Sequence, residues 1–212
     1  MKLYLLLSLV VFQFCACKKD STAPKDFATV MKNSVWSGQA NVAAKPSQPI
    51  SMSFADGGQM FWYDVQNAVP GTWKIESGLL IVTLNNGAGF TAKLANDNTL
   101  TNIVNLPTTN LSLTTATLNT SPDPVLDNTV WSSSVNNIVI RFKPGNKLDL
   151  EIGPMGTTKY TGLSYTVDAR TVRFSALSTY KWMLTANGNS SMKGVNVFLP
   201  DPTVYTYEVT KQ

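Results

Sequence analysis

The chain has 212 residues, with 17 Lys or Arg, 13 Asp or Glu, no His, and only two cysteines, Cys15 and Cys17. These counts exclude zinc sites built from His and Cys, catalytic triads that need His, and a disulfide framework in the rest of the chain. The formal net charge of +4 comes from scattered side chains rather than a dense basic cluster, so we expect no nucleic-acid partner.

Residues 1–16 are predicted to be a signal peptide. A positive start, Met1-Lys2, precedes a mostly apolar run over residues 3–14. This run has the length of a signal-peptide core and falls short of the roughly 20 residues that a transmembrane helix needs. Because a polar stretch begins at Lys18, we expect residues 17–32 to form a tether.

The junction at Ala16-Cys17-Lys18-Lys19 resembles that of Bacteroidetes-type lipoprotein precursors. The resemblance implies lipidation of Cys17, which would become the first mature residue and anchor the protein firmly in a membrane. It also implies an outer-membrane location, since no Asp directly follows the cysteine. The chain departs from the family pattern at Phe14 and Cys15, where Leu and a small residue are usual. The alternative is an ordinary secreted protein with an incidental cysteine.

The rest of the chain has the pattern of β-strands. Only residues 25–33 show helical spacing, which predicts one or two helical turns. Alternation at Ile50, Met52 and Phe54 predicts a strand, and the following turn leads into a second strand over residues 59–65. Further short strands are predicted at 73–76, 79–84, 90–94, 138–142, 147–152, 165–167, 172–174, 181–184 and 204–209.

The two halves of the chain repeat one pattern. The segment Asn33-Ser-Val-Trp36-Ser returns as Asn128-Thr-Val-Trp131-Ser, and Ile50-x-x-x-Phe54-x-x-Gly57 returns as Ile138-x-x-x-Phe142-x-x-Gly145. Three more matches follow in the same order: Trp73-x-Ile75 with Tyr165-x-Val167, Leu80-x-Val82 with Val172-x-Phe174, and Leu94 with Leu184. We therefore predict a β domain over 33–118, a proline-containing linker over 119–127 and a second β domain over 128–212.

Each half resembles the lipocalin-like domains of Bacteroidetes lipoproteins. The resemblance rests on an initial Trp, a Phe-x-x-Gly hairpin, an aromatic-x-Ile/Val strand and a later Leu. These are Trp36, Phe54, Asp56, Gly57, Trp73, Ile75, Val82 and Leu94, then Trp131, Phe142, Gly145, Tyr165, Val167, Phe174 and Leu184. It implies an all-β fold class with two tandem antiparallel β-barrel or sandwich repeats, and more a fold than an activity.

No nucleophile motif or phosphate loop is present, and we predict no enzyme, cofactor or metal site. Paired carboxylates could still hydrolyse glycosides without histidine. The candidates are Asp56, Asp64, Glu76 and Asp97, then Asp149, Glu151, Asp168 and Glu208. Solvated charge on strand ends is the simpler interpretation. A turn is likewise the simpler interpretation of Asn96-Asp97-Asn98 than a calcium loop.

The aromatic run Phe61-Trp62-Tyr63 offers a candidate binding surface. If Phe61 points into the core, Trp62 points outward, and Trp62 and Tyr63 could then contact a ligand. The alternative is that Trp62 covers the other half of the duplication. We expect a non-catalytic envelope lipoprotein that binds an apolar small molecule or a glycan. The alternatives are a structural or assembly lipoprotein that docks another envelope protein and, more remotely, a glycoside hydrolase.

Overall fold

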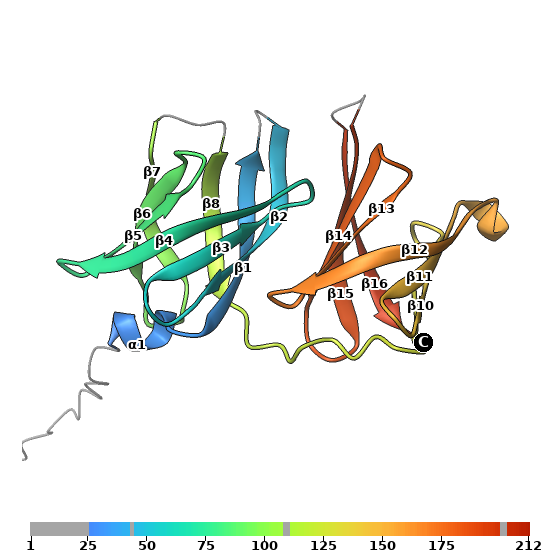
Figure 1. Ribbon diagram of the computed structural model, residues 1–212, viewed down its shortest axis with the longest axis horizontal. Coiled ribbons are helices and arrows are strands. Elements are labelled where there is room, and N and C mark those ends of the chain that lie inside the picture. Colours follow the sequence, from blue (N-terminus) through green and yellow to red (C-terminus); the bar gives the residue numbers. More distant parts are fainter. Residues whose placement is uncertain (1–25, 43–44, 108–110, 200–202) are drawn as a thin grey trace, which may run out of the picture.

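A computed structural model describes residues 26–42, 45–107, 111–199 and 203–212. It shows two eight-stranded antiparallel barrel-like sheets side by side, joined by an extended linker (Figure 1). A short helix, α1 (Phe27–Met31), precedes the first sheet, as the sequence predicts. Its first turn is capped by the side chain of Asp26, which accepts from Ala28 N at 3.1 Å. Residues 1–16 and Cys17 lie outside the described residues.

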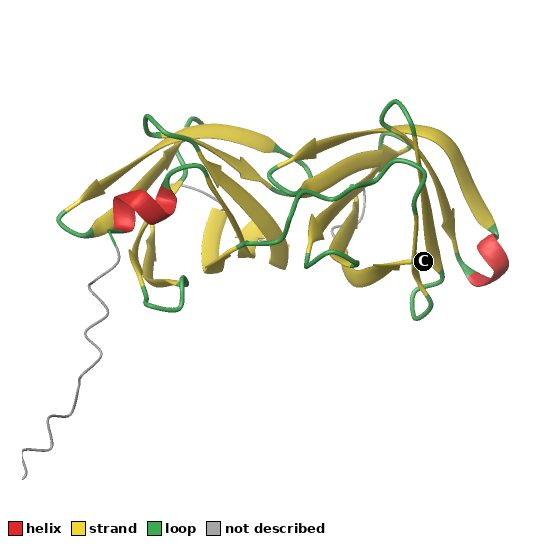
Figure 2. Cartoon of the chain, turned by 90° about the horizontal axis from the view of Figure 1, so that it is seen from below, coloured by secondary structure: helices red, strands yellow, loops and turns green. Residues whose placement is uncertain are grey.

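Both sheets are antiparallel meanders in which consecutive strands pair, except that the eighth strand of the first sheet forms its ladder with the first strand and not with the seventh. The first contains β1 (Ser34–Val42), β2 (Lys45–Phe54), β3 (Gln59–Tyr63), β4 (Ala68–Glu76), β5 (Leu79–Leu84), β6 (Gly89–Leu94), β7 (Leu100–Asn105) and β8 (Leu111–Leu118). The second contains β9 (Val130–Ser133), β10 (Ile138–Lys143), β11 (Lys147–Ile152), β12 (Thr158–Asp168), β13 (Thr171–Ala176), β14 (Tyr180–Ala186), β15 (Ser191–Phe198) and β16 (Val204–Lys211). A short 3₁₀ turn, η1 (Pro154–Gly156), lies at the end of the second barrel far from the first (Figure 2).

The second sheet closes through pairing of β16 with β9. The first closes less completely, because β7 and β8 share one isolated bridge, Thr99 with Thr117. A bulge at Asn102, where φ is 49°, turns β7 away from a regular ladder. The side chain of Asn105 completes the seam: its Nδ2 donates to Leu113 O at 3.0 Å, and its Oδ1 accepts from Leu113 N at 2.8 Å.

Alternate side chains fill both interiors, as the period of two predicts. The largest fully buried side chains of the first barrel include Trp36, Trp62, Phe54 and Phe90. Those of the second include Trp131, Trp182 and Phe142. Each barrel therefore has its own aromatic core rather than an open interior of the kind that holds an apolar ligand.

The duplication extends to individual side-chain contacts. Trp36 Nε1 donates to Ser34 Oγ at 2.9 Å, and Trp131 Nε1 donates to Thr129 Oγ1 at the same distance. Ser34 and Thr129 in turn donate to the carbonyl oxygens of Met31 and Leu126. Edge-to-face ring pairs also recur, between Phe54 and Trp73 at 5.9 Å and between Phe142 and Tyr165 at 5.2 Å.

One of the five sequence matches is out of register. Leu80 pairs with Ala92, and Val172, the counterpart of Leu80, pairs with Leu184. Leu184 therefore corresponds to Ala92 and not to Leu94. The two hairpins have the same span, since the paired residues lie 12 positions apart in each. The prediction was wrong because similar polar residues follow Leu94 and Leu184 and suggested a match that the pairing does not have.

The barrels contact each other through β2, β3 and the segment after β3 on one side and through strands β13 to β16 on the other. Buried Val65 packs there with Met183, Val195 and Val197, and with the partly buried Val204. The halves thus form separate sheets that share an apolar interface. Among the described residues, no helix has the length and hydropathy needed to cross a membrane.

Candidate functional site

Trp62 lies inside the first barrel, opposite to the orientation predicted from the sequence. Its side chain is fully buried, whereas Phe61 is 42% exposed. Register explains the difference, because Trp62 pairs with Met52 and cross-strand partners share a face. Aromatic residues occupy both faces of β3, so the alternation could not decide which face is internal. Trp62 Nε1 donates to Asp64 Oδ2 at 3.2 Å, and no part of the ring is available at the surface.

Tyr63 lies at the interface between the barrels. The guanidinium carbon of Arg173 lies 5.2 Å from the centre of the Tyr63 ring, within the range of a cation–π contact. The other neighbour of the ring is Phe61, which stacks at 6.1 Å. Burial raises the pKa of the Tyr63 phenol. Tyr63 therefore covers the other half of the duplication, a role that the sequence analysis considered for Trp62.

The candidate carboxylates serve structural contacts. Buried Asp64 accepts from the backbone N–H groups of Gln66 and Asn67, each at 2.8 Å. On the outer face of β11, Asp149 pairs with Lys143 at 2.5 Å, and Glu151 lies 3.6 Å from Arg141. The hydrogen bond from Lys143, aided by the Gly162 N–H, lowers the pKa of Asp149.

The segment Asn96-Asp97-Asn98 forms a turn, in which Asp97 Oδ1 accepts from both the N–H and the hydroxyl of Thr99. Within the described ranges, no group of three or more Asp, Glu or Cys side chains is placed to hold a metal ion.

A cleft with a volume of about 460 Å³ lies between the barrels. We call it the interdomain cleft. This volume falls within the range of about 300–1,000 Å³ that is usual for small-molecule sites. Its lining residues come from β1, β2, β8, the linker, β14, β15 and the turn between these last two strands: Ser37, Gly38, Gln39, Pro49, Ile50, Thr115, Thr117, Leu118, Asn119, Thr120, Ser121, Thr185, Ala186, Asn187 and Lys193.

Asn119 lines the interdomain cleft and joins the two barrels by hydrogen bonds. Its Nδ2 donates to Ser37 Oγ at 2.8 Å and to Ala186 O at 3.2 Å. Its Oδ1 accepts from Ser121 N at 2.9 Å, and Ser121 Oγ accepts from Gly188 N at 2.8 Å. One buried amide thus fixes the start of the linker against both barrels.

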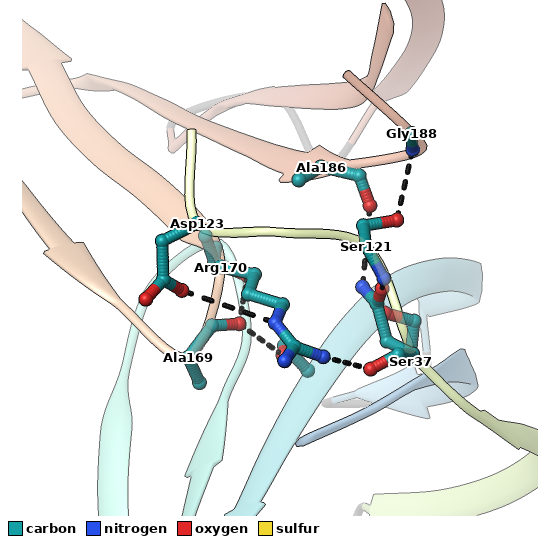
Figure 3. Close-up of polar contacts among 10 residues, drawn as sticks. Ser37, Ser121, Asp123, Ala169, Arg170, Ala186 and Gly188 are labelled. Carbon is teal, nitrogen blue, oxygen red and sulfur yellow. Dashed lines mark hydrogen bonds and ion pairs between the residues drawn. The ribbon is translucent and has the colours of Figure 1, made fainter. Parts of the chain in front are cut away.

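The turn between β12 and β13, in the second barrel, also contacts the linker and the first barrel. Ala169 and Arg170 both have positive φ, 50° and 60°, a conformation that costs non-glycine residues energy. Contacts across the interface hold it: Ser51 Oγ donates to Ala169 O at 3.0 Å, and Arg170 donates to Asn119 O. Arg170 Nε also lies 3.8 Å from Asp123 Oδ1 of the linker (Figure 3). The relative position of the barrels, and with it the shape of the cleft, depends on this turn.

The chemistry of the interdomain cleft is that of neutral hydrogen bonding. Hydroxyl and amide side chains make up most of its polar lining, and Lys193 is the one charged residue among its described lining residues. Sequence reasoning missed this site because its walls come from both repeats and the linker. Only the polar composition of residues 119–121 gave a signal, and it predicted a connection rather than a cavity.

No protein-family model matches the chain, and no curated protein matches its sequence.

Proposed function

We propose that this protein is a non-catalytic lipoprotein of the outer membrane that binds a neutral, hydroxylated ligand such as a glycan in the interdomain cleft. The supporting observation is the contrast between the filled barrels and the cleft. Tryptophan and phenylalanine side chains occupy both interiors, while a cavity of about 460 Å³ lined by hydroxyl and amide groups lies between the barrels. Such groups suit the hydroxyls of a sugar better than an apolar molecule.

Substitution of Thr117 tests the location of the ligand site. Thr117 is exposed and lines the cleft, so Thr117→Trp should fill the cleft without disturbing a core. Backbone amide shifts of Asn187 during titration with a panel of neutral mono- to tetrasaccharides provide the readout. We expect wild-type shifts that saturate and at least tenfold weaker binding in Thr117→Trp. The control is Thr83→Trp, at an exposed threonine of β5 outside the cleft. Failure of every saccharide to shift Asn187 would contradict glycan binding.

Anchoring at Cys17 is tested separately, by labelled palmitate and fractionation. We expect the wild-type chain to take up palmitate and sediment with outer membranes, and Cys17→Ser to be soluble, because the acyl chains supply the membrane affinity. Wild-type protein that takes up no palmitate would contradict the lipoprotein assignment.

A second candidate function is docking to another envelope protein. Val135 and Met155 are almost fully exposed, at 88% and 101%, in two neighbouring turns of the second barrel. The turns are joined by a hydrogen bond from Gly153 N to Asn137 O at 2.9 Å. This candidate predicts that Cys17→Ser protein still sediments with outer membranes and that adding Val135→Lys and Met155→Lys releases it.

A further inference from the structure

A second, smaller cavity lies between the linker and the mouth of the second barrel. Its volume is about 250 Å³, and we call it the linker pocket. It is lined by Pro122, Asp123, Pro124, Val125, Trp131, Ala186, Gly188, Asn189, Met192 and Lys211. Prolines, Val125, Met192 and the Trp131 ring make its walls largely apolar. Because the volume falls below the usual size of a whole ligand site, the pocket suits one part of a larger molecule.

Comparison of the repeats explains why this pocket exists. In the first repeat, helix α1 packs Phe27 and Val30 onto the core. In the second, Leu126 is buried in the position of Met31, but Val125, the counterpart of Val30, is 76% exposed. Pro124 disfavours helical backbone at Asp123, and the segment stays extended. The linker therefore does not pack as a helix on the end of the barrel, and the pocket lies between the linker and the barrel.

The linker pocket adjoins the interdomain cleft. Ala186 lines both cavities, and the linker continues from one to the other, with residues 119–121 in the cleft and 122–125 in the pocket. The hydrogen bond from Gly188 N to Ser121 Oγ joins a pocket residue to a cleft residue. The two charged residues of the pocket, Asp123 and Lys211, have opposite signs, and Asp123 already pairs with Arg170. The pair of cavities thus presents a polar neutral part and an apolar part side by side.

We infer that the interdomain cleft and the linker pocket form one bipartite site for an amphiphile, with a hydroxylated head in the cleft and a short apolar tail in the pocket. This inference rests on the proposed function, because it takes the cleft as the site of the head. Beyond that function, we expect an amphiphile with an apolar tail to bind more tightly than the hydroxylated head group alone. Burial of each methylene should tighten binding about fourfold until the pocket is full.

Alkyl glucosides test the inference on the full chain carrying Cys17→Ser. Methyl, butyl and hexyl β-D-glucoside are titrated while two groups of NMR signals are followed. The backbone amides of Thr117 and Asn187 report on the cleft. The indole Nε1–H of Trp131 reports on the pocket, because Trp131 alone among the five tryptophans lines it. We expect methyl glucoside to shift only the cleft signals, and hexyl glucoside to shift both groups and to bind at least tenfold more tightly.

Two exposed valines, one in the linker and one in the second barrel, give a matched pair of variants. Val125→Trp should fill the pocket and abolish the gain in affinity with increasing length of the alkyl chain. Val135→Trp, at a valine 88% exposed in the turn between β9 and β10, should keep the gain.

Other outcomes overturn the inference in distinguishable ways. Cleft shifts without any dependence on chain length refute the bipartite site and leave the cleft intact as a binding site. The absence of cleft shifts with all three glucosides refutes both the bipartite site and glucoside binding in the cleft. Binding of 1-hexanol as tight as that of hexyl glucoside refutes the contribution of the head.

Discussion

Ser34 and Thr129 each lie two residues before a buried tryptophan and play the same part in the two repeats. Each hydroxyl accepts from the indole and donates to a carbonyl of the preceding turn. The residues before them, Asn33 and Asn128, both have positive φ, which asparagine tolerates better than most residues. The sequence motif Asn-Ser/Thr-Val-Trp thus produces the same backbone turn and the same hydrogen bonds at the start of each barrel. This shared structure explains why the motif is the clearest sign of duplication.

Removal of the hydroxyl at Ser34 should destabilise the first barrel. Ser34→Ala leaves the buried Trp36 indole N–H without its acceptor, which we expect to lower the free energy of unfolding by about 1–3 kcal/mol. Urea denaturation followed by tryptophan fluorescence measures the change. Ser47→Ala, at an exposed serine of β2, is the control and should change stability by less than about 0.5 kcal/mol. Equal stability of the two variants would contradict this role for Ser34.

The phenol of Tyr207 makes stability depend on alkaline pH. Its hydroxyl is buried and has no hydrogen-bond partner in the described structure, and burial raises its pKa well above the usual value. An acid whose pKa is raised by folding contributes stability that is complete below the unfolded pKa, near 10, and is lost as the pH rises beyond it. We expect Tyr207→Phe to keep its stability at pH 8 and to lose less than the wild type between pH 10 and 11.

The slope above pH 10 should fall by about 1.4 kcal/mol per pH unit, the value for one proton. Urea midpoints across this range measure it, with Tyr205→Phe, at a tyrosine 57% exposed, as control. An unchanged slope in Tyr207→Phe would show that the phenol ionises equally in both states.

At the scale of elements, the seam between β7 and β8 distinguishes the two barrels. Where the second barrel closes by strand pairing, the first uses the side chain of Asn105 as a substitute for a backbone partner. A bulge at Asn102 interrupts the ladder between β6 and β7 in the same barrel. Strand periodicity predicted the elements themselves, but neither the bulge nor the closure, because both depend on how neighbouring strands pair once the sheet has curved round.

Loss of the Asn105 side chain should open this seam. We expect Asn105→Ala to lower the free energy of unfolding by about 1–3 kcal/mol, since Leu113 loses a partner for both its N–H and its carbonyl oxygen. Hydrogen exchange of the Leu113 amide should accelerate more than that of strands elsewhere in the barrel. Asn41→Ala, at an exposed asparagine of β1, serves as control. Unchanged exchange at Leu113 would mean that the seam closes without Asn105.

At the scale of the whole molecule, the interface between the barrels creates the candidate site. An apolar patch around Val65 and Met183 brings the barrels together, while Asn119 and the Ala169-Arg170 turn fix the linker. Since the interdomain cleft has walls from both repeats, its shape exists only while these contacts hold.

Arg170→Ala should loosen the arrangement of the barrels. The variant frees the carbonyl of Asn119 and the carboxylate of Asp123, so we expect faster proteolysis within residues 119–127 and a larger radius of gyration in small-angle scattering. Arg141→Ala, on the outer face of the second barrel beside Glu151, is the matched control. If the two variants are cleaved at the same rate, the apolar patch alone positions the barrels.

The sequence by itself determined the fold class, the duplication and the hairpins, because alternation, turn residues and the Asn-Ser/Thr-Val-Trp motif are local signals that each repeat carries twice. The orientation of Trp62, the correspondence of Leu184 with Ala92, the closure by Asn105 and the interdomain cleft were decided only by the tertiary structure. These features depend on which residues far apart in the chain pair or pack together, and aromatic residues on both faces of a strand, or polar residues in a linker, fit several such arrangements equally well.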